Sequence, residues 1–172
     1  MHGGLGMQAV GWIMAVALVT WVFHDYLDRD ANPNRVPTVT ASGEVVLQRN
    51  RAGQFTADGT INGERVQFIV DTGATQIAIP ESLAARLKLK RGMPIDLLTA
   101  AGPSRGYSTR LQSVRLATIE AKDLAAVVAE GMHPEIVLLG MNFLRRLEIV
   151  QRGDQLILSA PPVSDKRSPK AP

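Results

Sequence analysis

Val70-Asp71-Thr72-Gly73-Ala74 places an ionisable carboxylate between two apolar runs of the chain. Val66-Gln67-Phe68-Ile69-Val70 leads into this stretch and Ile77-Ala78-Ile79 follows it, and both runs are typical of buried strands. A carboxylate at the end of a buried strand is costly to desolvate unless its neighbours stabilise it. Two interpretations of Asp71 stand side by side. It is a turn aspartate, because Asp and Gly are common in turns, or a catalytic carboxylate presented by a rigid element.

The composition favours one domain with its own core and excludes several kinds of chemistry. The chain has 172 residues, of which 45% are hydrophobic. Without cysteine it has no disulfide framework, no thiolate nucleophile and no cysteine metal site. The histidines lie far apart in the sequence, so we expect ordinary surface histidines, no metal and no cofactor. The net charge of +3 comes with only 5% aromatic residues and no basic cluster among them, so no nucleic-acid binding is expected.

The N-terminal region, residues 1–24, is predicted to be a membrane anchor helix. The run Leu5–Phe23 carries no formal charge, and as a helix it would span about 28 Å, close to the hydrocarbon core of a bilayer. A cleaved signal peptide is one alternative, but Met1–Gly6 has no Lys or Arg and no cleavage site follows the apolar run. A buried helix of a soluble protein is the other. The acidic flank Asp25–Asp30 favours a non-cytoplasmic location for the domain that follows.

Three further segments follow the anchor. Residues 25–43 are polar and contain Pro33 and Pro37, so they are predicted to form a flexible linker. Residues 44–160 are predicted to form the folded domain. Residues 161–172 are charged and rich in proline, which predicts a disordered tail.

Short apolar runs separated by turn signals predict that the domain is all-β, a small barrel or sandwich of about eight or nine strands. Hairpin turns are expected at Asp58-Gly59 and Asn62-Gly63, and a polar turn at Glu120–Asp123. Two short helices are expected, one starting at Pro80 and one over Met141–Leu147, because apolar residues recur there at i, i+4.

Two sequence motifs and a hairpin between them resemble a known family. Phe68-Ile69-Val70-Asp71-Thr72-Gly73-Ala74-Thr75 is followed by Val137-Leu138-Leu139-Gly140-Met141-Asn142-Phe143-Leu144. Between them, Leu98–Ser108 is expected to form a hairpin whose tip has no large apolar side chains. The order of these features resembles the retropepsin-type aspartic proteases, and most of all their bacterial membrane-anchored members. The resemblance runs from about Gly53 to Ser159 and implies a retropepsin-like acid-protease barrel.

The resemblance implies a role for each matching residue. Asp71 would be the catalytic aspartate of the active-site loop. Thr72 would hydrogen-bond to its counterpart in a second subunit, Gly73 would present backbone to substrate and water, and Ala74 would line the cleft. The other implied residues are those of the cleft and the flap that bind substrate, Thr75, Ala100, Ala101 and Gly102, and those that support the loop, Leu138, Leu139 and Gly140.

The chain departs from the viral members of the family at two places. Those members have an ion pair between an Asp and an Arg at the positions of Thr75 and Met141, and here both partners are replaced, so no charge is left unpaired. Pro103 and Arg105 stand where viral flaps are richer in glycine, so a stiffer flap is expected.

A single Asp-Thr-Gly in one chain has a mechanistic consequence. One carboxylate cannot act as acid and base at once, so two chains must each supply Asp71 across a two-fold axis. The expected protein is a homodimeric aspartic endopeptidase of peptide or protein substrates that needs no cofactor. Its expected place is the bacterial inner membrane, as a single-pass protein with a periplasmic protease domain. The alternative is a catalytically silent retropepsin-fold module that binds or regulates.

Overall fold

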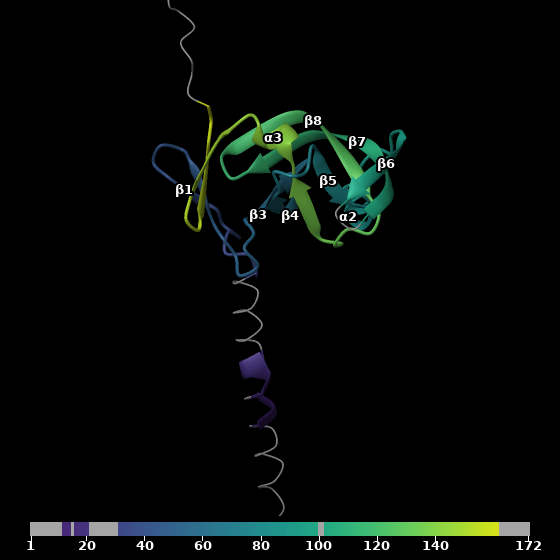
Figure 1. Ribbon diagram of the computed structural model, residues 1–172. Helices are drawn as coiled ribbons and strands as arrows, with labels where there is room; N and C mark the ends of the chain where they lie inside the picture. Colours follow the sequence, from purple (N-terminus) through teal and green to yellow (C-terminus); the bar gives the residue numbers. More distant parts are fainter. Residues whose placement is uncertain (1–11, 15, 21–30, 100–101, 162–172) are drawn as a thin grey trace, which may run out of the picture.

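The computed structural model describes residues 12–14, 16–20, 31–99 and 102–161. Most of the described part is β-structure, with two short helices inside the domain (Figure 1). The elements are β1 (Thr38–Val39), β2 (Val45–Gln48), β3 (Thr56–Ile61), β4 (Glu64–Val70), β5 (Ile77–Pro80), α2 (Glu81–Arg86), β6 (Pro94–Thr99), β7 (Gly102–Leu116), β8 (Ile119–Ala129), β9 (Ile136–Leu139), α3 (Met141–Leu144), β10 (Glu148–Arg152) and β11 (Gln155–Ser159). The predicted all-β class is thus confirmed in a coarser form, as a mostly-β fold with few short helices, for this part of the chain.

The larger sheet has seven strands in the order β3-β4-β9-β5-β8-β7-β6, and β3 also pairs with β7. This extra pairing bends the sheet back on itself, so that the inward side chains form one core. Alternation in β4 shows how the sequence selects the inward face: Val66 and Phe68 are buried, whereas Gln67 and Ile69 face outward and are half-buried.

The smaller sheet has four strands in the order β1-β2-β11-β10, all antiparallel. It stands at one end of the domain, beside the larger sheet (Figure 1). Inward residues of its two middle strands, Val45, Leu47, Leu156 and Leu158, are buried and join the same core. Gly153 and Asp154 form the turn between its last two strands, β10 and β11.

One of the two predicted hairpin turns is present in the structure and the other is not. Asn62 and Gly63 do form the hairpin turn between β3 and β4, with φ of 52° and 87°. Asp58-Gly59, also expected to be a turn, lies inside β3. Gly59 is needed there for close packing, because a Cβ atom would lie 2.3 Å from the Arg115 carbonyl oxygen and 2.6 Å from the Phe68 ring.

The prediction of a polar turn at Glu120–Asp123 is also wrong. The chain reverses earlier, at Ala117-Thr118, and β8 runs through the polar residues from Ile119 onward. Asp123 adopts a φ of 57° within β8, so the local turn signal produces an irregular strand and not a reversal.

The segment expected to be a flexible linker is, from residue 31 onward, attached to the domain. Asn32 and Asn34 are 4% and 3% exposed. The Asn34 side-chain amide donates to the carbonyl oxygens of Gln48 (2.8 Å) and Thr56 (2.6 Å), and its oxygen accepts from the Gln48 N–H (2.7 Å). Asn32 donates to the Asp58 carboxylate at 2.6 Å. Partial burial raises the pKa of the Asp58 carboxyl above its ordinary value, although that hydrogen bond and two arginines oppose the shift.

Most of the predicted anchor, residues 1–24, and the predicted tail beyond Pro161 lie outside the described residues. Residues 12–14 and 16–20 are helical, and large apolar side chains such as Trp12 and Val19 are exposed there. Within the described ranges, no helix is both long enough and apolar enough to cross a membrane.

Candidate active site

The Asp71 loop is positioned by three strands. β4 runs parallel to β9, with Val70 opposite Leu139, and the Asp71 N–H donates to the Leu139 carbonyl oxygen at 3.2 Å. The chain then turns and returns as β5 on the other side of β9, where Ala78 pairs with Leu138. The loop therefore crosses the end of β9, and the predicted support residues Leu138 and Leu139 lie directly beneath it.

Asp71 is half-buried, and its orientation is set within the loop. Its Oδ1 accepts a hydrogen bond of 2.9 Å from the Gly73 N–H. Thr72 and Gly73 are exposed, so the carboxylate is presented at the surface of this chain and not inside its core. A carboxylate held by a backbone donor at the end of a rigid strand is a suitable general base or acid.

The end of the loop is attached to the start of α3. The Met141 and Asn142 N–H groups donate to the carbonyl oxygens of Ala74 (2.8 Å) and Thr75 (3.1 Å). Gly140 makes this approach possible, because a Cβ atom there would lie 2.3 Å from the Gln76 carbonyl oxygen and 2.8 Å from that of Ala74. Gly140, which the resemblance implies supports the loop, lies at this contact, and its role stays a prediction.

Asn142 is a positioning residue that the sequence reasoning missed. Its side-chain oxygen accepts from the Ile77 N–H at 3.1 Å, and its amide nitrogen donates to the Ala125 carbonyl oxygen at 2.6 Å. The side chain thus bridges the start of β5 to β8 and fixes the chain where it leaves the loop. The available signal was a polar residue two positions after Gly140, within a segment expected to form a short helix.

The predicted flap residues are only partly described. β6 and β7 form an antiparallel hairpin from the pair Pro94–Tyr107 to the pair Thr99–Gly102. Gly102 opens β7 with a φ of 110°, whereas the tip residues Ala100 and Ala101 lie outside the described residues. Within the hairpin expected over Leu98–Ser108, the residues from Gly102 onward belong to β7. Contact of Ala100, Ala101 and Gly102 with substrate stays a prediction.

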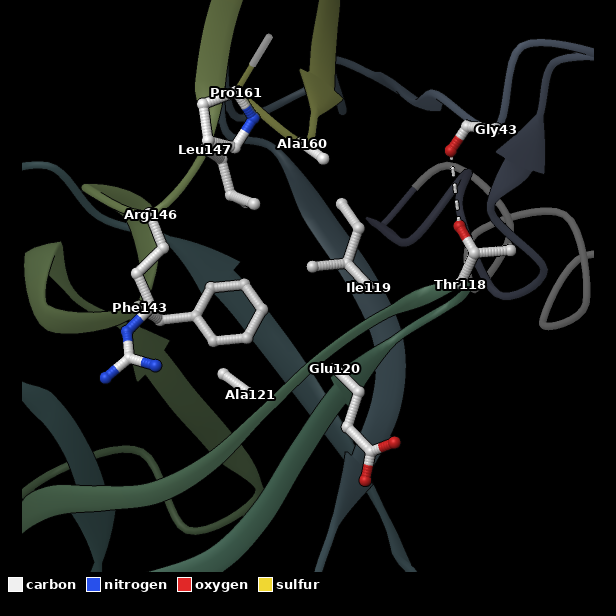
Figure 2. A pocket seen from close by; sticks show the side chains of 10 residues that line it. All are labelled: Gly43, Thr118, Ile119, Glu120, Ala121, Phe143, Arg146, Leu147, Ala160 and Pro161. Carbon is white, nitrogen blue, oxygen red and sulfur yellow. Dashed lines mark hydrogen bonds between the residues drawn. The ribbon is translucent and has the colours of Figure 1, made fainter. Parts of the chain in front are cut away.

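Two of the cavities formed by the described residues are lined as follows. A cavity of about 360 Å³ is lined by Gln67, Ile69 and Ile136 of β4 and β9, among others. Another, of about 390 Å³, lies between the start of β8 and the segment after α3 (Figure 2). At one end of it the Thr118 hydroxyl donates to the Gly43 carbonyl oxygen at 3.3 Å. None of the predicted site residues lines either of these two cavities. Within the described part, no group of three or more potential metal-binding side chains is assembled.

The Asp71-Thr72-Gly73 loop thus crosses the end of the apolar strand β9, in a sheet that bends back on itself. A family model described as "gag-polyprotein putative aspartyl protease" matches residues 57–146, more than half of the chain. The chain belongs to the retropepsin-like aspartic protease family.

Two curated proteins and one solved structure are similar to this chain. A Sinorhizobium protein named "Uncharacterized protein in cobV 5'region" is 31% identical over 170 residues, covering 90% of this chain and 73% of that protein. An uncharacterised Rickettsia prowazekii protein is 34% identical over 114 residues, covering 63% of this chain and about half (48%) of that protein. The crystal structure of a retropepsin-like aspartic protease from Rickettsia conorii is similar with a TM-score of 0.57. It is 34% identical, and the match covers 67% of this chain and 89% of that one.

Proposed function

We propose that this chain is a membrane-anchored, homodimeric aspartic endopeptidase that hydrolyses peptide bonds with a water activated between two Asp71 carboxylates. The observation that carries the proposal is the Asp71 loop itself. Its carboxylate is oriented by the Gly73 N–H, and the loop is fixed at both ends by β9 and α3. Such preorganisation is what catalysis by positioned carboxylates needs.

The chemistry requires two carboxylates with different protonation states. Two carboxylates about 3 Å apart cannot both ionise, so the pair shares one proton. The ionised Asp71 removes a proton from the water, whose oxygen attacks the peptide carbonyl carbon. The protonated Asp71 of the other chain stabilises the developing oxyanion and, as the C–N bond breaks, a proton passes to the leaving nitrogen. Thr75, Ala74 and the hairpin residues Ala100, Ala101 and Gly102 would contact the bound peptide.

The exposure of the loop supports a dimer. Each chain carries one Asp-Thr-Gly, and its Thr72 and Gly73 face solvent in the single chain. In a two-fold dimer these residues would meet their counterparts, with Thr72 hydrogen-bonding across the axis, and the exposed loop would become the centre of the interface.

The proposal of a membrane anchor rests on the sequence of residues 1–24 and on the exposed apolar side chains of the helical residues 12–14 and 16–20. We propose a single-pass protein of a bacterial inner membrane, with the protease domain in the periplasm. A reporter fused to the C-terminus that is active only in the periplasm should give signal, and signal from a reporter active only in the cytoplasm would contradict the orientation.

Activity is tested with the full chain in detergent micelles. Unfolded protein substrate is incubated with the parent chain and with Asp71→Asn at several pH values, and the products are identified by mass spectrometry. The proposal predicts cleavage by the parent chain alone. Equal products from both chains, or none from either at any pH, would contradict it, and the second result is what a catalytically silent module predicts.

A further inference from the structure

The segment Ala31–Asn34, which we call the clamp, connects the predicted anchor to the domain and is hydrogen-bonded to it. Asn32 and Asn34 are both buried. The Asn34 side-chain amide donates to the carbonyl oxygens of Gln48 and Thr56, and its oxygen accepts from the Gln48 N–H. Both amide hydrogens of this side chain are therefore used on the backbone of the domain.

The two strands that the clamp joins belong to different sheets. Gln48 is the last residue of β2, in the four-stranded sheet, and Thr56 is the first residue of β3, in the seven-stranded sheet. The Asn34 carbonyl oxygen accepts from the Asp58 N–H of β3 at 3.2 Å, and the Asn32 amide donates to the carboxylate of the same residue at 2.6 Å. A segment bonded to both sheets cannot leave the domain without breaking several of these bonds together.

The start of the clamp is close to the Asp71 loop. The Ala31 carbonyl oxygen accepts from the Thr56 hydroxyl at 3.1 Å. Thr56 is paired with Ile69 of β4, which precedes Asp71 by two residues, or about 7 Å along the strand. Because neighbouring strands are about 5 Å apart, Ala31 lies no more than about 20 Å from the Asp71 carboxylate.

The clamp shortens the connection between the domain and the predicted anchor. Only residues 25–30 separate that anchor from Ala31. At about 3.3 Å per residue they can span at most about 20 Å, whereas the whole segment 25–43, if free, could span about 60 Å. With the clamp in place, Asp71 lies within about 40 Å of the end of the anchor, a distance that about twelve residues of extended substrate would cover.

We propose that the clamp limits how far the active site reaches from the membrane, and that the substrates are proteins of the same membrane, cut within about 40 Å of the bilayer. The inference rests on the proposed function, because it needs both the anchor and the protease. A tethered enzyme meets a target within its reach at a high effective concentration, which falls to nearly zero where the tether cannot span the distance. Substrate choice therefore depends on the height of a peptide bond above the bilayer as well as on its sequence.

The test places the same insertion on either side of the clamp. A flexible Gly/Ser segment of about twenty residues, which adds about 25 Å on average to a free connection, is inserted before or after it. The first insertion lies between Arg29 and Asp30, and the second between Val36 and Pro37. Val36 is 87% exposed, and lengthening a surface loop costs little stability. If the clamp holds, only the first insertion raises the domain above the membrane.

The height of the domain is measured first, without any cleavage. The chain has no cysteine, so Met93→Cys, at a residue that is 76% exposed, provides a single site for a fluorescent donor. Each labelled full chain is reconstituted into liposomes that carry an acceptor on their lipid head groups. Energy transfer should be the same in the parent chain and the second insertion, and about twofold lower in the first insertion. Equal transfer from the two insertions, or failure of the parent chain to stay with the liposomes, would overturn the inference.

The reach of the active site is then measured by cleavage in the same liposomes. Two single-pass model substrates carry the same unfolded segment behind a proline-rich spacer of about 15 Å or about 75 Å. The parent chain and the second insertion should cut the short-spacer substrate about tenfold faster than the long-spacer substrate, because the long spacer exceeds their reach. The first insertion should cut both at similar rates. All three chains should cut soluble unfolded protein equally fast, which shows that the insertions leave the domain intact.

The clamp and the proposed function fail in different ways. If no chain cuts any substrate but energy transfer follows the expected pattern, the clamp controls the height of the domain, and the protease function is contradicted together with the substrate class. If the parent chain cuts both model substrates at equal rates, or if the two insertions give the same pattern of cleavage, the protease function stands and the limit on reach is refuted.

Discussion

Gly140→Ala tests whether close contact between β9 and the Asp71 loop controls activity. A Cβ atom at this position would lie 2.3 Å from the Gln76 carbonyl oxygen, 2.5 Å from its carbon and 2.8 Å from the Ala74 carbonyl oxygen. All three are backbone atoms, so no flexible side chain can move away. Because ordinary contacts begin near 3.4 Å, the loop must shift by about 1 Å.

That shift sets the expected magnitudes. Overpacking of this kind costs about 1–3 kcal/mol of unfolding free energy, which the domain should tolerate. Displacing a catalytic group by about 1 Å costs on the order of 100-fold in rate. The substitution should therefore reduce kcat/KM by about 100-fold in a chain that remains folded, as measured by cleavage of unfolded protein beside urea unfolding.

Gly153→Ala is the matched control for Gly140→Ala. Gly153 has a φ of 57° and no atom within 4 Å of an added Cβ, in the turn between β10 and β11. Alanine in that left-handed conformation costs about 1–2 kcal/mol without touching the loop. Its specific activity should stay within about threefold of the parent chain. A folded Gly140→Ala chain with parent activity, or an equal loss in Gly153→Ala, would refute the reasoning.

Three further predictions concern the bonds around the site. Asn142→Ala leaves the Ile77 N–H and the Ala125 carbonyl oxygen without their side-chain partner. It should lower the free energy of unfolding, measured in urea, by about 2–4 kcal/mol and should also lower activity. An unchanged unfolding midpoint would contradict this prediction. Asn34→Ala removes three side-chain hydrogen bonds of a buried residue and should lower the free energy of unfolding by about 3 kcal/mol, whereas the exposed control Val36→Ala should change it by less than about 0.5 kcal/mol. Asp58 has a raised pKa in the fold, so the folded state holds its proton more tightly and the parent chain loses stability as the pH rises from the ordinary value of 3.8 through the raised one. Unfolding of Asp58→Asn across pH should lack this loss, and parallel pH profiles would contradict the prediction.

The parts of the site that could be predicted are contiguous in the sequence. The Asp71 loop lies between two apolar strands, and the alternation of Val66 and Phe68 already indicates which face is buried. Asn142 could not be predicted in the same way. Its two partners are 65 and 17 residues away, and nothing in a single amide indicates which distant backbone groups it will reach.

The differences between the predicted and the observed fold have one common cause. A local sequence pattern does not show which residues from distant parts of the chain will contact it. Asn32 and Asn34 are typical of a solvated linker, yet they are buried because β2 and β3 offer backbone groups for their amides. Asp58-Gly59 is a strong turn signal, but the Gly59 position is set by the Phe68 ring and a neighbouring strand. In each case the composition correctly shows that the segment is polar, but it cannot predict which groups of the folded chain its residues will contact.

In the proposed mechanism, Asp71 acts only when it faces a second Asp71. The most direct measurement adds increasing amounts of Asp71→Asn chain to a fixed amount of parent chain, allows subunits to exchange, and records the cleavage rate. If two chains share one site, random pairing places half of the parent chains in inactive dimers at equal amounts, so the rate should fall to about half and continue to fall with excess. A rate that stays constant at every ratio, with exchange confirmed by labelled chains, would show that one chain holds a complete site and would contradict the account.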